Sequence, residues 1–272
     1  MPFNTLKPAH KAFQAVTALL LTAALPAHAA WDQLNLPRGV TSTSQEVYDL
    51  HMLALWVCTV IGIIVFAVMI YALVKFRKSK GAVAAKFTHS TKAEVIWTIL
   101  PTLVLVFLAY ESAPALIRVE DTRNSEMTIK ITGYQWKWQY EYVGQNVSFF
   151  STLAQTSNTA RQLNSGQDPF GVENYLLEVD RPLVVPVGTK IRYLLTSNDV
   201  NHAWWVIDLA VKRDAIPGYI NEGWFTIDKP GTYRGQCAEL CGKDHGFMPV
   251  VVEALPKAEF EAWLASQQAP AT

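Results

Sequence analysis

The chain has 272 residues and a formal net charge of zero; half of its residues are hydrophobic and 17% are charged. The balanced charge provides no global attraction to nucleic acid, so no nucleic-acid partner is expected. The apolar composition is unusual for a soluble protein and indicates membrane segments. The three cysteines, Cys58, Cys237 and Cys241, are too few and odd in number for a disulfide framework.

The first thirty residues have the three parts of a secretory signal. A basic start is followed by an apolar run over residues 15–25 and by the small-residue pattern Ala27-His28-Ala29. An apolar run of that length is too short to span a bilayer. We therefore expect residues 1–29 to be cleaved and residues 30–50 to form an exported segment.

Two membrane spans are expected next. Residues 52–74 carry no charge and would form a helix of about 34 Å, enough for a bilayer core of about 30 Å. Residues 95–117 form the second span if Glu111 lies at the interface or faces a partner. The connecting residues 75–94 contain six lysines and arginines against one acid, which marks the cytoplasmic side. Both mature termini are therefore expected outside.

Beyond the spans the pattern changes to short strands. Runs rich in Val, Ile, Leu and Tyr are separated by turn residues at 127–132, 176–179, 183–187 and 191–195. Residues 155–168 look like a surface loop, and residues 258–268 like a helix within a C-terminal segment, 257–272. The fold class expected is an α+β membrane protein, a two-helix hairpin followed by an all-β sandwich over residues 119–256.

A cluster of possible metal ligands lies near the C-terminus. Four side chains of the kinds that bind soft metals fall within twelve residues, and a fifth lies upstream: Cys237, Cys241, His245, Met248 and His202. One Cys, two His and a weak Met make a mononuclear electron-transfer copper site. A second thiolate lets two sulfurs bridge two coppers. Met248 can then be the weak ligand of one copper, and the backbone carbonyl of Glu239 that of the other.

Other interpretations of these residues remain open. In an exported domain, Cys237 and Cys241 can form a disulfide. Zinc accepts two Cys and two His, although it has no use for the thioether. His202 alone would be an ordinary structural histidine, and Cys58 is expected to be an inert apolar filler of its span.

Five motifs make the chain resemble subunit II of bacterial haem-copper cytochrome c oxidases, from its first span to its end. They are the start of the second span, an aromatic stretch, the surroundings of the first His, a following loop and the Cys loop: Glu94–Pro101, Gly133–Tyr142, Asn198–Trp204, Lys212–Gly218 and Gly235–Pro249. The sequence departs from the family pattern at Tyr134, Lys137 and Ala238. Of these, Lys137 adds a positive charge where a basic partner would dock.

The resemblance implies a cupredoxin-like Greek-key domain with a dinuclear copper centre, CuA. Its bridging thiolates, terminal imidazoles and weak ligands would be Cys237 and Cys241, His202 and His245, and Met248 with the Glu239 carbonyl. The Glu239 side chain would help to hold a magnesium shared with subunit I.

The resemblance also assigns roles outside the copper loop. Trp136 would be the surface ring where the electron enters, and Glu94 would lie at the mouth of a proton path into subunit I. Acids at Glu141, Asp180 and Asp199 would attract cytochrome c. Each has a plainer alternative: a packed strand aromatic for Trp136, a headgroup contact for Glu94, and solvated charges for the acids.

The function implied is electron relay from cytochrome c to haem in subunit I, where oxygen is reduced to water with proton pumping. Subunits I and III would be the partners, in a bacterial inner membrane with the copper domain in the periplasm. A copper subunit of a related nitric oxide reductase and an exported copper-binding protein are the alternatives.

Overall fold

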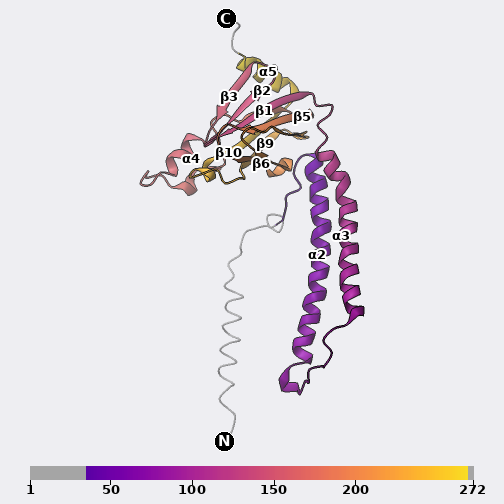
Figure 1. The fold of residues 1–272 in the computed structure, drawn as a ribbon. Coiled ribbons are helices and arrows are strands. Elements are labelled where there is room, and N and C mark those ends of the chain that lie inside the picture. Colours follow the sequence, from indigo (N-terminus) through magenta and orange to yellow (C-terminus); the bar gives the residue numbers. More distant parts are fainter. Residues whose placement is uncertain (1–34, 269–272) are drawn as a thin grey trace. The chain divides into compact units, whose positions relative to one another are not determined.

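The computed structural model describes residues 35–268 (Figure 1). The expected signal, residues 1–29, lies outside this range and stays a prediction. Within the described range, two long helices are followed by ten strands in two sheets and by a C-terminal helix.

The two expected spans are helices, and both are longer than predicted. α2 (Ser42–Lys75) begins at a capping box in which the Thr41 and Ser44 side chains each accept the other's backbone N–H. α3 (Thr91–Val119) is capped by Ser90. At 34 and 29 residues, the helices are about 51 and 44 Å long. Part of the expected exported segment, from Ser42 onward, is therefore helical and extends α2 beyond the bilayer core.

The surfaces of both helices are apolar and open. None of the most hydrophobic window of either helix is buried within the chain. Apolar surface of this extent requires lipid or other subunits around it. The short connection between the helices contains a single turn, η2 (Lys78–Lys80), and carries the lysines and arginines.

Two five-stranded sheets form the remainder. One sheet has the order β3-β2-β1-β5-β8 and the other β4-β10-β9-β6-β7. The strands of the first are Val147–Ser151, Lys137–Tyr142, Met127–Tyr134, Ile191–Ser197 and Asn221–Phe225. Those of the second are Leu183–Pro186, Pro249–Leu255, Gly231–Cys237, His202–Val206 and Val211–Ala215. The pairs β1–β5 and β4–β10 are parallel, and the other pairs are antiparallel.

The core between the sheets is rich in aromatic rings. Trp138, Tyr140 and Tyr142 point inward from β2 and are fully buried. The Tyr142 hydroxyl donates to the Val184 carbonyl at 2.7 Å and accepts from the Val184 N–H at 3.1 Å. It therefore ties β2 to β4 of the opposite sheet, and losing such a buried bond costs about 1–3 kcal/mol.

Two details of the sequence-based prediction were wrong. Residues 176–179 do not form a strand; only Val179 pairs, in an isolated bridge with Leu153, because Leu176 adopts a left-handed backbone conformation (φ 63°). The predicted loop 155–168 begins with a short helix, α4 (Gln155–Ala160), and is followed by η3 (Pro169–Gly171). His202 is the first residue of β6.

The other predicted elements were confirmed. The strands predicted at 127–132 and 191–195 are present and extend two residues further, and the one predicted at 183–187 ends one residue earlier. The C-terminal helix is α5 (Lys257–Gln267). The sandwich class and the hairpin before it are as expected.

Candidate metal centre

Backbone pairing brings the predicted ligands together. Cys237 ends β9, which pairs with β6 on one side and with β10 on the other. The Cys237 N–H donates to the Met248 carbonyl at 3.0 Å, and the Ala238 N–H donates to the Ala203 carbonyl at 3.0 Å. His202 and Met248, far apart in sequence, are therefore held on opposite sides of Cys237.

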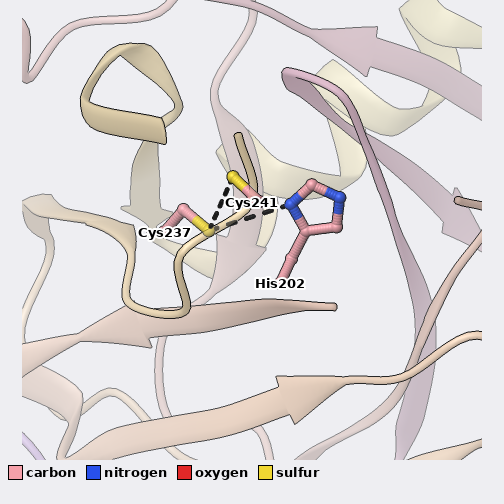
Figure 2. A group of neighbouring side chains, drawn as sticks. All are labelled: His202, Cys237 and Cys241. Atoms are coloured by element: carbon pink, nitrogen blue, oxygen red, sulfur yellow. Dashed lines mark hydrogen bonds between the residues drawn. The ribbon is translucent and has the colours of Figure 1, made fainter. Parts of the chain in front are cut away.

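Each thiol lies beside one imidazole. The Cys237 Sγ is 3.8 Å from the Nδ1 of His202, and the Cys241 Sγ is 3.5 Å from the Nδ1 of His245. The two sulfur atoms are 3.8 Å apart. Figure 2 shows the two sulfurs and the His202 ring turned toward one another; these three ligand atoms all lie within 4.8 Å.

The sulfur separation argues against a disulfide. A disulfide has an S–S length of about 2.05 Å, and both cysteines are free. Two sulfurs that share one tetrahedral metal, with metal–sulfur bonds of about 2.3 Å, would lie about 3.8 Å apart. The buried pair of thiols thus has the spacing of two ligands of a common metal.

The remaining donors favour copper over zinc. The Glu239 carbonyl is 3.3 Å from the Cys237 Sγ. Met248 is 1% exposed, and its backbone carbonyl accepts the Cys237 N–H. Zinc sites use thiolate, imidazole and carboxylate, whereas a thioether suits copper. The donor set therefore fits copper.

The two thiols differ in acidity. Burial opposes ionisation of Cys237, but the hydrogen bond with the His202 ring helps to lower the pKa of its thiol to about 7. Burial, followed by the neighbouring charge of Cys237, raises the pKa of the Cys241 thiol to about 12. Without metal the pair therefore binds at least one proton at neutral pH, and metal binding must release it.

Asp199 orients the buried histidine. One Asp199 carboxylate oxygen lies 2.9 Å from the Nε2 of His202 and the other accepts the Gln135 N–H at 2.7 Å. Because Nε2 bonds the carboxylate, Nδ1 faces Cys237. A carboxylate behind a ligating histidine fixes its tautomer and orientation. The sequence had offered Asp199 only as a docking acid.

Gly133 leaves the room that the His202 ring needs. A Cβ at this position would lie 2.8 Å from the ring Cδ2. The motif Gly133–Tyr142 was noted for its aromatic residues, and nothing in the spacing identified the glycine. A side chain at position 133 would push the ring away from Cys237.

Trp136 contacts the copper loop directly. Its indole N–H donates to the Cys241 carbonyl at 3.1 Å, and the Gln135 side chain donates to the same oxygen at 2.9 Å. The ring is half-buried, unlike the fully buried Trp138. The cation over the Trp136 ring is Lys243, at 5.7 Å.

Lys137, the basic residue noted next to Trp136, has another position. Its ammonium lies 4.3 Å from the centre of the Phe150 ring. The positive charge expected at Trp136 is therefore supplied by the copper loop itself.

The other predicted residues lie elsewhere. Glu141 is in β2, paired with Lys130 at 3.7 Å, and Asp180 accepts from the Thr152 N–H at 2.7 Å. Glu94 is in the first turn of α3, whose other end, Val119, leads toward β1. The 25 residue steps from Glu94 to Val119 place it about 38 Å along the helix from that end of α3.

Comparison with known proteins gives the family. The family model "Cytochrome C oxidase subunit II, periplasmic domain" matches residues 127–255, and that of the transmembrane domain matches residues 29–114. A probable cytochrome c oxidase subunit 2 of Rickettsia bellii is 36% identical over 236 residues, covering 86% of this chain and 84% of the relative. The chain belongs to the cytochrome c oxidase subunit II family.

The chain is also similar to proteins of other organisms. Cytochrome c oxidase subunit 2 of Arabidopsis thaliana is 36% identical over 243 residues, covering 88% of this chain and 91% of the relative. Among solved structures, the periplasmic domain of subunit II of the cytochrome oxidase of Bradyrhizobium japonicum is 40% identical and covers 54% of this chain and 96% of that one, with a TM-score of 0.47.

Membership confirms the predicted family, fold class and function. This subunit II is a membrane protein with two transmembrane helices and a periplasmic domain, and it is part of a haem-copper oxidase. It is the subunit through which electrons enter that enzyme, and its buried His and Cys group is consistent with a copper site. The family match favours this function over the two alternatives, a nitric oxide reductase subunit and an exported copper-binding protein.

Asp199→Asn should weaken copper binding by about 10–100-fold, as is usual when the group that orients a ligating histidine is lost. An amide can donate to Nε2 and so allow the wrong tautomer. Competition with a copper chelator measures the affinity. Asp180→Asn, which changes an exposed acid with no contact to a ligand, is the control; equal affinities for the two variants would contradict the role of Asp199.

Proposed function

We propose that the copper site of this subunit is dinuclear and that it takes single electrons from reduced cytochrome c and passes them to haem in subunit I. The observation that carries the proposal is the pair of buried sulfurs 3.8 Å apart, each beside its own imidazole. A set with two thiols and two imidazoles has enough donors for two metals that share the sulfurs.

The ligand roles follow from the contacts. Cys237 and Cys241 would bridge, and His202 and His245 would each hold one metal through Nδ1. Met248 and the Glu239 carbonyl would be the weak ligands. Bound copper supplies a one-electron couple; the chain supplies donors that its fold holds in place, so that little has to move when the charge changes.

Trp136 is proposed as the place where the electron enters. Its indole reaches from the half-exposed surface to the carbonyl of a bridging cysteine through one hydrogen bond. Within residues 35–268, no other tryptophan side chain donates a hydrogen bond to the Cys loop.

Exposed acids are proposed to steer the donor. Glu141 and Asp180 are on the surface, and part of Asp199 is exposed as well. A single exposed pair contributes at most about 1 kcal/mol, but several acids together raise the encounter rate with a basic protein. Lys243 over Trp136 opposes this attraction locally, whereas Asp199, which accepts the N–H of the adjacent Gln135, places one acid beside the tryptophan.

Three further roles come from the family likeness. Glu94 would stand at the mouth of a proton path into subunit I; it lies in the first turn of α3, at the end away from the β domain. The exposed Glu239 side chain would help to hold magnesium at subunit I. Subunit III would complete the complex, in a bacterial inner membrane with the copper domain and both mature termini in the periplasm.

Copper counting tests the dinuclear site. The full chain, reduced and loaded with copper in detergent, should bind two coppers and show the hyperfine pattern of one electron shared by two nuclei. Cys241→Ser removes one bridge and should give the pattern of a single copper. Cys58→Ser, in the first span, should leave two. One copper per wild-type chain, or a Cys237–Cys241 disulfide that persists after reduction, would contradict the proposal.

Trp136→Ala in the assembled oxidase should slow copper reduction by cytochrome c by about tenfold or more, the usual effect of truncating an interface tryptophan. Trp224→Ala is a matched control, because that half-buried indole also donates to a backbone carbonyl, that of Arg118, at 3.0 Å. Rapid mixing measures the rate, and the copper spectrum must stay unchanged. A wild-type rate for Trp136→Ala would contradict its role.

Glu94→Gln should lower oxygen consumption by the assembled oxidase without changing the rate at which cytochrome c reduces the copper.

A further inference from the structure

Arg161 reaches the copper loop from a segment remote in sequence. It is the C-cap of α4, between β3 and β4. Its Nη1 lies 3.3 Å from a carboxylate oxygen of Asp244, and its guanidinium carbon lies 4.2 Å from the centre of the Phe247 ring. Asp244 and Phe247 flank the proposed ligand His245, and Met248 follows.

Contacts within and around α4 fix the backbone and the Nε of Arg161. The buried Ser157 and Ala160 seat α4 on the domain, and the Ser157 hydroxyl accepts the Leu176 N–H at 3.1 Å. The Arg161 Nε donates to the Asn158 side chain at 2.8 Å. The guanidinium therefore has a fixed direction before it meets the copper loop.

The turn that it contacts has little support of its own. His245 lies in η5 (His245–Phe247), a single turn with no side-chain cap. His202, by contrast, is fully buried in a strand and bonded to Asp199. In the part of the chain that the structure describes, no carboxylate is recorded at the His245 ring. The two halves of the site are thus positioned by different means.

We propose that Arg161 is a positioning residue for the copper centre, which fixes the His245 turn through Asp244 and Phe247 and balances the Asp244 charge beside it. This inference rests on the proposed copper function. Side chains of Arg161 and Asp244 are only 21% and 24% exposed, so solvent screens them less than a surface pair. Arginine is always charged and its planar group suits both a carboxylate and a ring face.

The charge balance predicts effects of opposite sign. Arg161→Gln leaves the Asp244 carboxylate uncompensated near the copper, which stabilises the oxidised state. Asp244→Asn leaves the guanidinium uncompensated, which stabilises the reduced state. Restoring the balance in the double variant should bring the equilibrium back toward the wild type.

The test uses the full chain, loaded with copper in detergent, and measures its redox equilibrium with a one-electron mediator. Arg161→Gln should shift this equilibrium about three- to tenfold toward oxidised copper, where tenfold corresponds to about 59 mV. Asp244→Asn should shift it in the opposite direction, and the double variant should lie between the two. Arg161→Lys keeps the positive charge, so its potential should lie closer to the wild type than that of Arg161→Gln. Because Lys lacks the planar group, its hyperfine pattern should return less completely to that of the wild type.

The matched control is Arg181→Gln. The Arg181 guanidinium lies at the same 4.2 Å from a ring centre, that of Phe149, and bonds Gln267 at 3.0 Å. It should change neither the potential nor the spectrum. Arg161→Gln with the potential and spectrum of Arg181→Gln, or shifts of the same sign in Arg161→Gln and Asp244→Asn, would overturn the proposal.

Two measurements distinguish a failure of the Arg161 proposal from misfolding of a variant and from failure of the proposed copper function. Circular dichroism and urea unfolding of the copper-free variants show whether they are folded; if Arg161→Gln is not, Arg161→Lys and Asp244→Asn still decide the sign of the charge effect. If the wild-type chain itself holds no dinuclear copper, the proposed function fails, and that outcome does not depend on any Arg161 variant.

Discussion

The constraint on which the site depends is the pairing of β9 with two neighbours at once. Cys237 ends a strand whose backbone is bonded to β6 on one side and to the start of β10 on the other. This pairing sets His202 and Met248 beside the first thiol without any metal. Cys241 and His245 then depend on the loop that leaves β9 and returns as β10. A rigid ladder thus defines one half of the donor set, and a loop completes it.

The surroundings of the two halves reflect that difference. The ladder half is buried, and the His202 ring is oriented by one carboxylate, Asp199, in the space left by Gly133. The loop half is tied down by contacts from outside it: Gln135 and Trp136 both bond the Cys241 carbonyl, and Arg161 holds Asp244. Because Trp136 bonds the loop, the same contact that steadies the site also gives it a short connection to the surface.

Much of this could be predicted from the sequence. Uncharged runs and the basic loop between them predict the hairpin, and alternating short strands predict the sandwich, because both patterns are local. The ligand spacing from Cys237 to Met248 is also local, and it identified the donors.

What the sequence could not give were contacts between segments far apart. Asp199 looked like a surface acid, because its bond to His202 depends on how the turn before β6 folds back. The alternation of Trp136 with Trp138 suggested one strand face, yet β2 begins only at Lys137, and Trp136 packs half-buried against the edge of the core. Arg161 lay in a stretch predicted as loop, and nothing local connects it to Asp244, 83 residues away.

The central claim is that electrons reach the oxidase through the copper site of this subunit. The direct measurement is rapid mixing of the intact oxidase with reduced cytochrome c, following copper and haem absorption in the same trace. The copper band should bleach first, at a rate that rises with cytochrome c concentration, and haem reduction should follow after a lag. Reduction of haem while the copper remains oxidised would contradict the account.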